Sequence, residues 1–307
     1  MDFRRLKYFI AVAEELHFGR AAARLEMAQP PLSRQIAALE AELGVQLFDR
    51  ARNQVRLTDA GAVLLDRARD ILADLDSAYR ETRQVGQGRS GRLRIAFVGS
   101  ATHGPLPTFI KSYRSHYPQV DLALSSMNNA ELERALIQRD IDIAVARPRL
   151  KGDEFRSALL IHEPLILALP DGSEPARRTG KLRLTDVAAE PFVLYPRRPR
   201  PSFADHILQT CADEGFTPVE QVFAQDYQTA ISLVAVGVGV AMVPRSVSFS
   251  ARSGVTYRDY EGNNPGTSLT VQARLDNRKP QVTNFFTLLA QFTRKARLPE
   301  AQLPPRG

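Results

Sequence analysis

The sequence of 307 residues contains one cysteine, no tryptophan and only five histidines. The single cysteine, Cys211, excludes internal disulfides and any metal site built from several cysteines. The histidines form no i, i+4 pair that could ligate a metal from one helix face; they are His17, His103, His116, His162 and His206. We therefore expect no metal centre and no cofactor.

Long hydrophobic runs are also missing, and no stretch approaches the apolar length needed to span a bilayer. The apolar segment 8–13 is short and is followed at once by Glu14 and Glu15, which is unlike a signal peptide. We expect a cytoplasmic protein with no membrane partner. The chain is long enough for two or three domains, and its hydrophobic content of 44% is typical of soluble globular proteins.

An excess of positive charge permits a nucleic-acid partner but does not locate it. The net charge is +7 and the sequence pI is about 9.7, yet residues 1–60 hold nine Lys and Arg against eight Asp and Glu. Local clusters must therefore carry any argument for nucleic-acid binding.

The segment 29–43 is the first informative stretch. Two prolines fit its first helical turn, where an N–H would be unpaired anyway. Leu32, Ile36 and Leu39 recur at helical spacing and form an apolar stripe, while Ser33, Arg34 and Gln35 lie off it. Such a polar face suits base edges and phosphates in a major groove. An ordinary amphipathic helix with a solvated face is the alternative.

The surroundings of this helix favour a winged helix-turn-helix. Segments 3–15 and 18–25 also read as helices, and a tight turn joins the second to segment 29–43. Alternating apolar residues around 45–47 and 55–57 then predict two short strands with a basic tip, which would grip the phosphate backbone. The alternative is a solvated basic loop. The candidate DNA-binding residues are Gln29, Pro30, Ser33, Arg34, Arg50, Arg52 and Arg56.

A long helix follows over residues 59–85, with Thr58 as its expected cap. Its narrow apolar seam comprises Leu64, Ala68, Leu72, Leu75, Tyr79 and Thr82. A helix of this length with so narrow a seam needs a partner, so we interpret it as a dimerisation helix. Packing on its own domain is the alternative. The glycine-rich stretch 86–91 marks a hinge and a domain boundary.

Beyond the hinge, strands are expected at 93–98, 120–124 and 141–146, where apolar residues do not alternate with polar ones. Helices are expected between them at 105–116 and 130–138. This order predicts a parallel sheet with right-handed crossovers. Further strands are expected at 165–169, 192–194, 219–223, 240–243 and 268–273, with helices at 203–212, 230–236 and 282–295. We expect two small α/β subdomains with a ligand-binding cleft between them, at the carboxyl ends of strands.

Three residues are placed to hold an anion at this cleft. Ser100 follows the first strand, Asn129 stands at a helix start, and Arg147 directly follows the third strand. Helix amino termini attract anions, and a guanidinium binds a carboxylate in a bidentate manner. Ser100 and Asn129 could instead only cap helices.

Catalytic motifs are missing from the sequence. Gly237-Val238-Gly239 lacks the third glycine of a dinucleotide fingerprint and precedes a strand, and no nucleophile elbow supports a Ser-His-Asp triad. We assign no catalytic residues and expect a protein that is not an enzyme. The alternatives to a DNA-binding protein with a ligand-binding cleft are a solute-binding module and a small α/β enzyme acting on an aromatic acid.

The first 53 residues resemble the DNA-binding domain of the LysR-type bacterial transcriptional regulators. The resemblance lies in Ala21-Ala22 with Leu25, in segments 29–36 and 47–50, in Leu39-Glu40 with Leu43-Gly44, and in the entry to the long helix at 57–61. It implies a homo-oligomer built through that helix, a dimer or a dimer of dimers, which binds an inverted-repeat operator in double-stranded DNA. It also implies a periplasmic-binding-protein-like effector domain after the hinge.

Segments 3–14, 194–196 and 200–205 resemble the benzoate-, muconate- and chlorocatechol-responsive branch of that family. By this resemblance Ser100, Arg147, Pro201 and Phe203 line the effector cleft. Asn129 departs from the expected threonine, and Arg197 and Arg198 make the loop more basic than expected. The implied function is an activator of an aromatic-compound catabolic operon that senses a small organic acid and acts on RNA polymerase.

The expected domains are a winged helix-turn-helix over 1–58, a linker helix over 59–87 and an effector domain over 88–307. Within the effector domain, subdomain I would comprise 91–163 and 268–297, and subdomain II would comprise 164–267.

Overall fold

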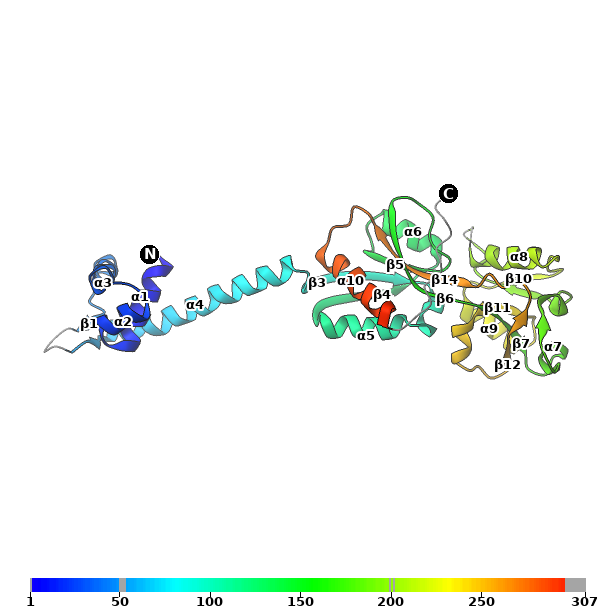
Figure 1. The fold of residues 1–307 in the computed structure, drawn as a ribbon, viewed down its shortest axis with the longest axis horizontal. Coiled ribbons are helices and arrows are strands. Elements are labelled where there is room, and N and C mark those ends of the chain that lie inside the picture. Colours follow the sequence, from blue (N-terminus) through cyan, green and yellow to red (C-terminus); the bar gives the residue numbers. More distant parts are fainter. Residues whose placement is uncertain (1, 50–53, 199, 201, 296–307) are drawn as a thin grey trace. The chain divides into compact units, whose positions relative to one another are not determined.

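The computed structural model describes residues 2–49, 54–198, 200 and 202–295, in two compact units that divide between residues 84 and 85. Arg50, Arg52 and Pro201 lie outside the described residues. Within those ranges no helix is both long and apolar enough to cross a membrane. Each unit is described on its own below (Figure 1).

The first unit begins with helices α1 (Phe3–Glu15), α2 (Phe18–Arg24) and α3 (Gln29–Leu43), followed by the antiparallel strands β1 (Phe48–Asp49) and β2 (Arg56–Leu57). The stripe expected on α3 is completely buried, and Gly44 ends that helix with a φ of 70°. The predicted winged helix-turn-helix is confirmed. Its core contains Leu6, Phe9, Val12, Phe18, Leu32, Ile36, Leu39, Leu47 and Phe48.

Two carboxylates fix the helices and the wing of this unit. Buried Glu40 accepts hydrogen bonds from the backbone N–H groups of Leu47 at 2.8 Å and Phe48 at 3.1 Å, which ties the start of the wing to α3. Glu14 on α1 accepts from Arg24 at 2.8 Å and from Arg69 at 2.9 Å. The hydrogen bonds from Arg69 and Arg24 lower the pKa of Glu14.

Helix α4 (Asp59–Gly86) is capped as expected, because Thr58 Oγ1 accepts from the Gly61 N–H at 3.0 Å. The expected seam on this helix divides into two parts. Ala68 is completely buried and Leu64 packs beside it against the core of the first unit, so this part packs within its own chain. Farther along, Tyr79 and Val85 are exposed.

Subdomain I of the second unit contains a five-stranded sheet in the order β4-β3-β5-β14-β6. Strands β3 (Ser90–Phe97), β4 (Gln119–Ser126) and β5 (Ile143–Ala146) are parallel, as predicted. Strand β14 (Thr267–Arg274) pairs antiparallel with β5 and with β6 (Phe155–Glu163), so the sheet is mixed rather than wholly parallel. Strand β6 was not expected. The sheet carries helices α5 (Leu106–His116), α6 (Asn129–Ile137) and α10 (Pro280–Lys295), and η2 (Gly99–His103).

Subdomain II is built on a second, smaller sheet in the order β11-β7-β12, which is antiparallel. These strands are β7 (Leu165–Pro170), β11 (Ala241–Pro244) and β12 (Val255–Arg258). A parallel pair, β9 (Phe192–Leu194) with β10 (Gln221–Phe223), continues the core. The other elements are β8 (Leu182–Arg183), β13 (Tyr260–Glu261), α7 (Glu174–Arg177), α8 (Phe203–Asp213), α9 (Tyr227–Ala235), η3 (Leu184–Val187) and η4 (Arg245–Phe249).

The chain passes from subdomain I to subdomain II after β6 and returns at β14, as expected for two crossings (Figure 1). Asn264 joins the two crossings, because its side chain accepts from the Leu165 N–H at 3.1 Å and donates to the Leu165 carbonyl at 2.8 Å.

The close packing of α4 on the wing gives a stability prediction. A Cβ added at Gly61 would clash with the backbone carbonyl of Leu47, whereas one added at Gly86 meets nothing within 4 Å. We expect Gly61→Ala to destabilise the first unit by about 1–3 kcal/mol, as overpacking does, and Gly86→Ala to be neutral or slightly stabilising. Amide hydrogen exchange of α3 in the full-length chain measures the difference. Equal protection in the two variants would contradict this packing.

Candidate functional site

The first candidate site is the polar face of α3 with the wing beside it. Arg34 is exposed and forms no hydrogen bond or ion pair with a described residue; Gln29 and Pro30 are also exposed, and Ser33 is half-buried. Arg56 on β2 is exposed and donates from Nη2 to Gln54 Oε1 at 2.8 Å. The described part of this face is therefore open to a ligand at Gln29, Pro30, Arg34 and Arg56, while Arg50 and Arg52 lie outside the described residues.

Gln35 differs from the expectation for this face. Arg5 on α1 donates from Nε to Gln35 Oε1 at 3.1 Å and from Nη1 to Glu42 Oε2 at 2.9 Å. The amide of Gln35 thus helps to hold α1 against α3 instead of facing outward. Ser33 and Arg34 form no side-chain hydrogen bond or ion pair with a described residue.

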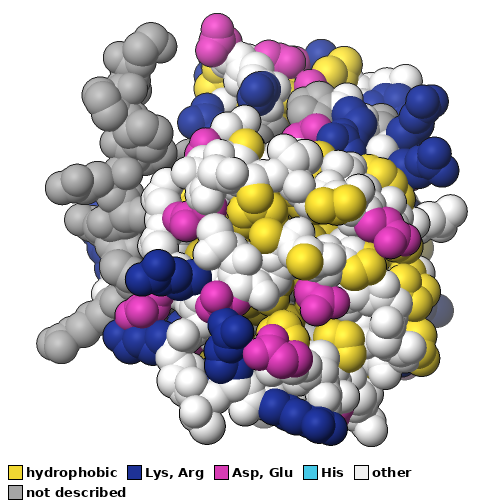
Figure 2. Space-filling view, turned by 90° about the vertical axis from the view of Figure 1, so that its right-hand side faces the viewer, with side chains coloured by type: hydrophobic (Ala, Val, Ile, Leu, Met, Phe, Trp, Pro, Cys, Tyr) yellow, Lys and Arg dark blue, Asp and Glu magenta, His cyan; other side chains and the backbone are white. Residues whose placement is uncertain are grey.

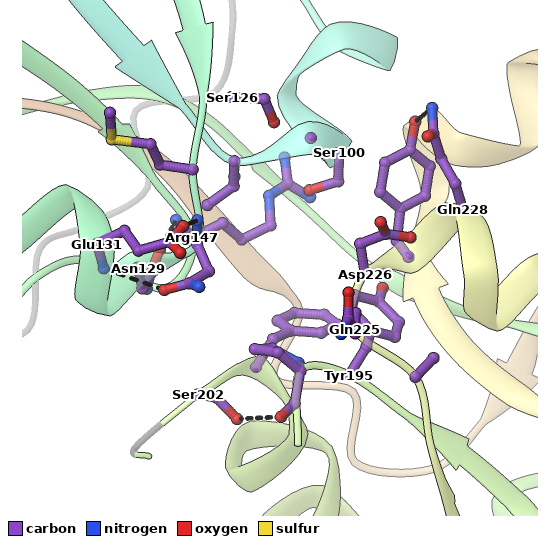
Figure 3. Close-up of a pocket in the computed structure, with 18 of the residues that line it drawn as sticks. Ser100, Ser126, Asn129, Glu131, Arg147, Tyr195, Ser202, Gln225, Asp226 and Gln228 are labelled. Atoms are coloured by element: carbon purple, nitrogen blue, oxygen red, sulfur yellow. Dashed lines mark hydrogen bonds between the residues drawn. The ribbon is translucent and has the colours of Figure 1, made fainter. Parts of the chain in front are cut away.

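The second candidate site is a pocket of about 940 Å³ between the two subdomains (Figure 3). Four of the five predicted effector residues line it, namely Ser100, Asn129, Arg147 and Phe203. Pro201 is outside the described residues. The lining also includes Arg197 and Arg198, the two basic residues that the sequence singled out.

Arg147 is buried at the carboxyl end of β5, with 3% of its surface exposed. Its Nη2 donates to Glu163 Oε1 at 2.6 Å, so the guanidinium already pairs with a carboxylate of its own chain. Its Nε and Nη1 are also buried, and no described residue bonds to them. Burial lowers the pKa of Arg147, and the charge of Glu163 opposes that shift. The group keeps two donors for a further acceptor.

Glu163 is the residue that sequence reasoning missed. It ends β6, and it accepts from the Ser246 N–H at 2.6 Å and from Ser246 Oγ at 3.0 Å, across the subdomain boundary. Because the strand itself was not expected, nothing in the sequence connected this carboxylate with Arg147. The pair joins the floor of the pocket in subdomain I to η4 in subdomain II.

Asn129 lies in the pocket wall, but its side chain is already engaged. Its Nδ2 donates to the Pro148 carbonyl at 2.7 Å, and its Oδ1 accepts from the Arg147 N–H at 3.3 Å. The cap of α6 is Asn128, which forms a capping box with Glu131. The sequence therefore placed the cap one residue too late, and Asn129 holds the backbone after β5.

An aromatic wall faces Arg147 from subdomain II. Phe203 is the first residue of α8, and its ring lies 5.3 Å from that of Tyr195 at an interplanar angle of 32°. The Tyr195 hydroxyl is buried without a hydrogen-bond partner among the described residues, and burial raises its pKa. On the opposite side, buried Ser100 in η2 forms no hydrogen bond with a described residue. Figure 3 shows the Arg147 side chain extending toward Ser100.

The rim of the pocket has both signs of charge. The Arg197 and Arg200 guanidinium groups each lie 5.9 Å from the centre of the Phe223 ring, and Arg200 pairs with Asp205. Asp226 caps α9 by accepting from the Thr229 N–H at 2.7 Å. Basic and acidic side chains are likewise interspersed, with hydrophobic ones between them, on the face of the molecule shown in Figure 2.

Metal chemistry finds no support at either site. No group of three or more His, Cys, Asp or Glu side chains in the described part of the chain is placed to hold an ion. Organic-acid recognition by fixed hydrogen-bond donors and an aromatic wall fits the pocket better.

Comparison with known families identifies both units. Residues 3–62 match the bacterial regulatory helix-turn-helix protein model of the lysR family, and residues 86–294 match the LysR substrate binding domain model. A relative described as a probable cat1 operon transcriptional activator, from Acinetobacter lwoffii, is 36% identical over 277 residues, which cover 90% of this chain and 91% of the relative.

Two solved structures are similar as well. Full-length CbnR complexed with its target DNA has a TM-score of 0.80 and 28% identity, covering 95% of this chain and 99% of that one. The BenM effector binding domain with its effector benzoate has a TM-score of 0.61 and 25% identity, covering 70% of this chain and 99% of that one. The second likeness is consistent with the benzoate-, muconate- and chlorocatechol-responsive branch.

These relatives are transcriptional regulators, which confirms the expectation that the protein is not an enzyme. The winged helix-turn-helix, the two-subdomain pocket unit and both family matches lead to one conclusion: the chain belongs to the LysR family of DNA-binding transcriptional regulators.

Proposed function

We propose that the protein is an effector-responsive activator of an aromatic-compound catabolic operon, and that it senses a small organic acid of the benzoate or muconate type. The observation that carries the proposal is the Arg147 guanidinium, which is buried in the pocket with no described residue bonded to its Nε or Nη1. Buried charged donors without partners are rare in folded proteins, and a carboxylate is the acceptor that suits a guanidinium best.

The rest of the pocket supports the same ligand class. The rings of Tyr195 and Phe203 cover an apolar or aromatic body, and the Tyr195 hydroxyl is buried with no hydrogen-bond partner among the described residues. Glu163 already neutralises much of the Arg147 charge, so recognition depends on hydrogen-bond geometry more than on net charge. A planar carboxylate fits this requirement better than a spherical anion.

Regulation requires that the ligand distinguishes two states of the protein. In our proposal the oligomer occupies and bends an inverted-repeat operator without effector. Effector binding closes the two subdomains and alters their packing across the oligomer, and the changed DNA bend recruits RNA polymerase. The functional units are the winged helix-turn-helix over 1–58, the linker helix over 59–87 and the effector domain over 88–307. A relative described as a transcriptional activator supports the sign of regulation.

DNA recognition by α3 can be separated from phosphate contact by the wing. If Arg34 forms a bidentate contact with a base, Arg34→Ala lowers operator affinity by about 1–3 kcal/mol and leaves non-specific affinity nearly unchanged. If Arg56 contacts phosphate, Arg56→Ala weakens binding to all sequences alike and reduces the salt slope by about one. Fluorescence anisotropy with operator and scrambled duplexes over a salt series distinguishes the two. An unchanged ratio of specific to non-specific affinity in Arg34→Ala would refute the role of Arg34.

Dimerisation through α4 is the second expectation. Leu72 and Leu75 are only half-buried within one chain, and Tyr79 is 62% exposed. We expect Leu72→Asp to weaken the dimer at least tenfold, because it places a charge in an apolar helix–helix contact. The neighbouring exposed position provides the matched control, Ala73→Asp. Sedimentation velocity over a micromolar concentration series measures both. Equal dimer strength in the two variants would mean that this seam is not the interface.

Binding of benzoate, used as the probe, tests the proposed role of Arg147 in the pocket. Arg147→Lys keeps a cation for Glu163 but loses the planar donors Nε and Nη1. Losing a hydrogen bond to a charged group costs about 1.5–3 kcal/mol, so benzoate should bind about 10–100-fold more weakly by calorimetry. Operator binding without benzoate should not change. Arg139→Lys, the same substitution at a surface ion pair with Asp276, is the control. Normal benzoate affinity in Arg147→Lys would disprove the site.

A further inference from the structure

A chain of hydrogen bonds crosses the subdomain boundary beside the pocket and has no part in holding the carboxylate. His103, the last residue of η2 in subdomain I, contacts two residues of subdomain II. Its Nε2 lies 2.6 Å from Tyr227 Oη, and its Nδ1 lies 2.9 Å from Ser250 Oγ. Tyr227 begins α9, and Ser250 follows η4.

The directions of these bonds are consistent with one protonation state of His103. Gln228 Nε2 donates to Tyr227 Oη at 3.1 Å, which leaves the phenol proton to be donated to His103 Nε2. An imidazole that accepts at Nε2 is neutral and has its proton on Nδ1, from which it donates to Ser250 Oγ. A second proton on Nε2 would take away that acceptor, and the Tyr227 hydroxyl would then have to turn and accept from His103 as well as from Gln228.

The Tyr227 ring also makes a close steric contact with subdomain I. Its Cε1 would lie 2.9 Å from a Cβ added at Gly99, so the ring rests against the glycine backbone. The His103 and Tyr227 rings are 5.2 Å apart and nearly perpendicular, at 86°. Because Tyr227 and Gly99 also line the pocket, separation of the subdomains along this seam would open the pocket wall.

We infer that His103, Tyr227 and Ser250 form a proton-sensitive latch that holds the two subdomains together around the pocket, engaged when His103 is neutral and released when it is protonated. The latch is a property of the seam itself. Only its consequence for ligand affinity rests on the proposed function.

The electrostatic surroundings agree with this sign. Burial lowers the pKa of His103, and no neighbouring charge contributes to the shift. The elements packed against η2 carry Lys111, Arg114 and His116 on α5 and Arg245 on η4, while Asp226 caps α9 and accepts from a backbone N–H of that helix. Arg245 pairs with Asp259.

The pH dependence follows from linkage between closure and proton binding. With the latch open, the His103 pKa is near its ordinary value of about 6.5, and with the latch engaged it is lower. Engagement is therefore stabilised fully above about pH 6.5 and is weakened as the pH falls below that value. At pH 5.5 the population ratio of engaged to open forms decreases by up to about tenfold relative to pH 7.5.

Hydrogen–deuterium exchange of the full-length chain at pH 7.5 and 5.5 tests the latch without any ligand, with labelling times scaled for the intrinsic pH dependence. In the wild type, scaled exchange of segments 99–104, 225–230 and 245–250 should rise at pH 5.5. His103→Gln should abolish this pH dependence, because glutamine does not titrate. Tyr227→Phe keeps the ring against Gly99 but removes the hydroxyl, so it should give the faster exchange already at pH 7.5.

The control is His116→Gln on α5, where the imidazole hydrogen-bonds to the Ser112 carbonyl of its own helix. This variant should keep the wild-type pH response. If His103→Gln shows the same pH response as the wild type, or if Tyr227→Phe exchanges like the wild type at pH 7.5, the latch does not exist.

Benzoate calorimetry at the two pH values then tests the consequence. Benzoate stays ionised at both, so wild-type affinity should fall at pH 5.5 by no more than about tenfold, and His103→Gln should show no such fall. Failure of benzoate to bind at either pH would count against the proposed function, while exchange alone would still decide the latch.

Discussion

The buried contact between Arg147 and Glu163 is the interaction on which the pocket depends. The Glu163 carboxylate accepts a hydrogen bond from Arg147 Nη2 in its own subdomain. It also accepts hydrogen bonds from the N–H and the hydroxyl of Ser246 in the other subdomain. One carboxylate therefore fixes the orientation of the guanidinium and ties the subdomains together where the chain crosses between them. Removing either charge would leave its partner's charge buried without an opposite charge, which is costly. A proposed ligand carboxylate would add an acceptor for Arg147 Nε and Nη1, to which no described residue bonds.

Hydrogen bonds join the two subdomains at two separate places beside the pocket. Near Arg147, Ser246 approaches Glu163; beyond Ser100, Tyr227 approaches His103. The first contact links β6 of subdomain I with η4 of subdomain II, and the second links η2 of subdomain I with α9 of subdomain II. In the function that we propose, a small acid bound between them contacts both subdomains at once, and this is the differential interaction that a conformational switch requires.

The sequence predicted most of the fold, but only part of the site. Helix and strand periodicity located α1 to α4, β3 to β5 and the residues Ser100 and Arg147, because each depends on local pattern or on position at a strand end. Phe203 was placed at the cleft by the family resemblance. Strand β6 alternates irregularly, so Glu163, 16 positions farther along the chain, was not connected with Arg147. The hydrogen bond from Asn129 to Pro148, and the burial of Ala68 in the core of the first unit, depend on tertiary packing that no local pattern contains.

The central claim is that occupancy of the pocket and binding of DNA are coupled in one protein. Thermodynamic reciprocity offers the most direct test, because an effector that changes operator affinity must have its own affinity changed by the operator to the same factor. The measurement is calorimetric titration of the full-length protein with benzoate, free and saturated with operator duplex. The account predicts affinities that differ about fivefold or more, with Arg147→Lys weak in both. Equal wild-type affinities in the two titrations would contradict it.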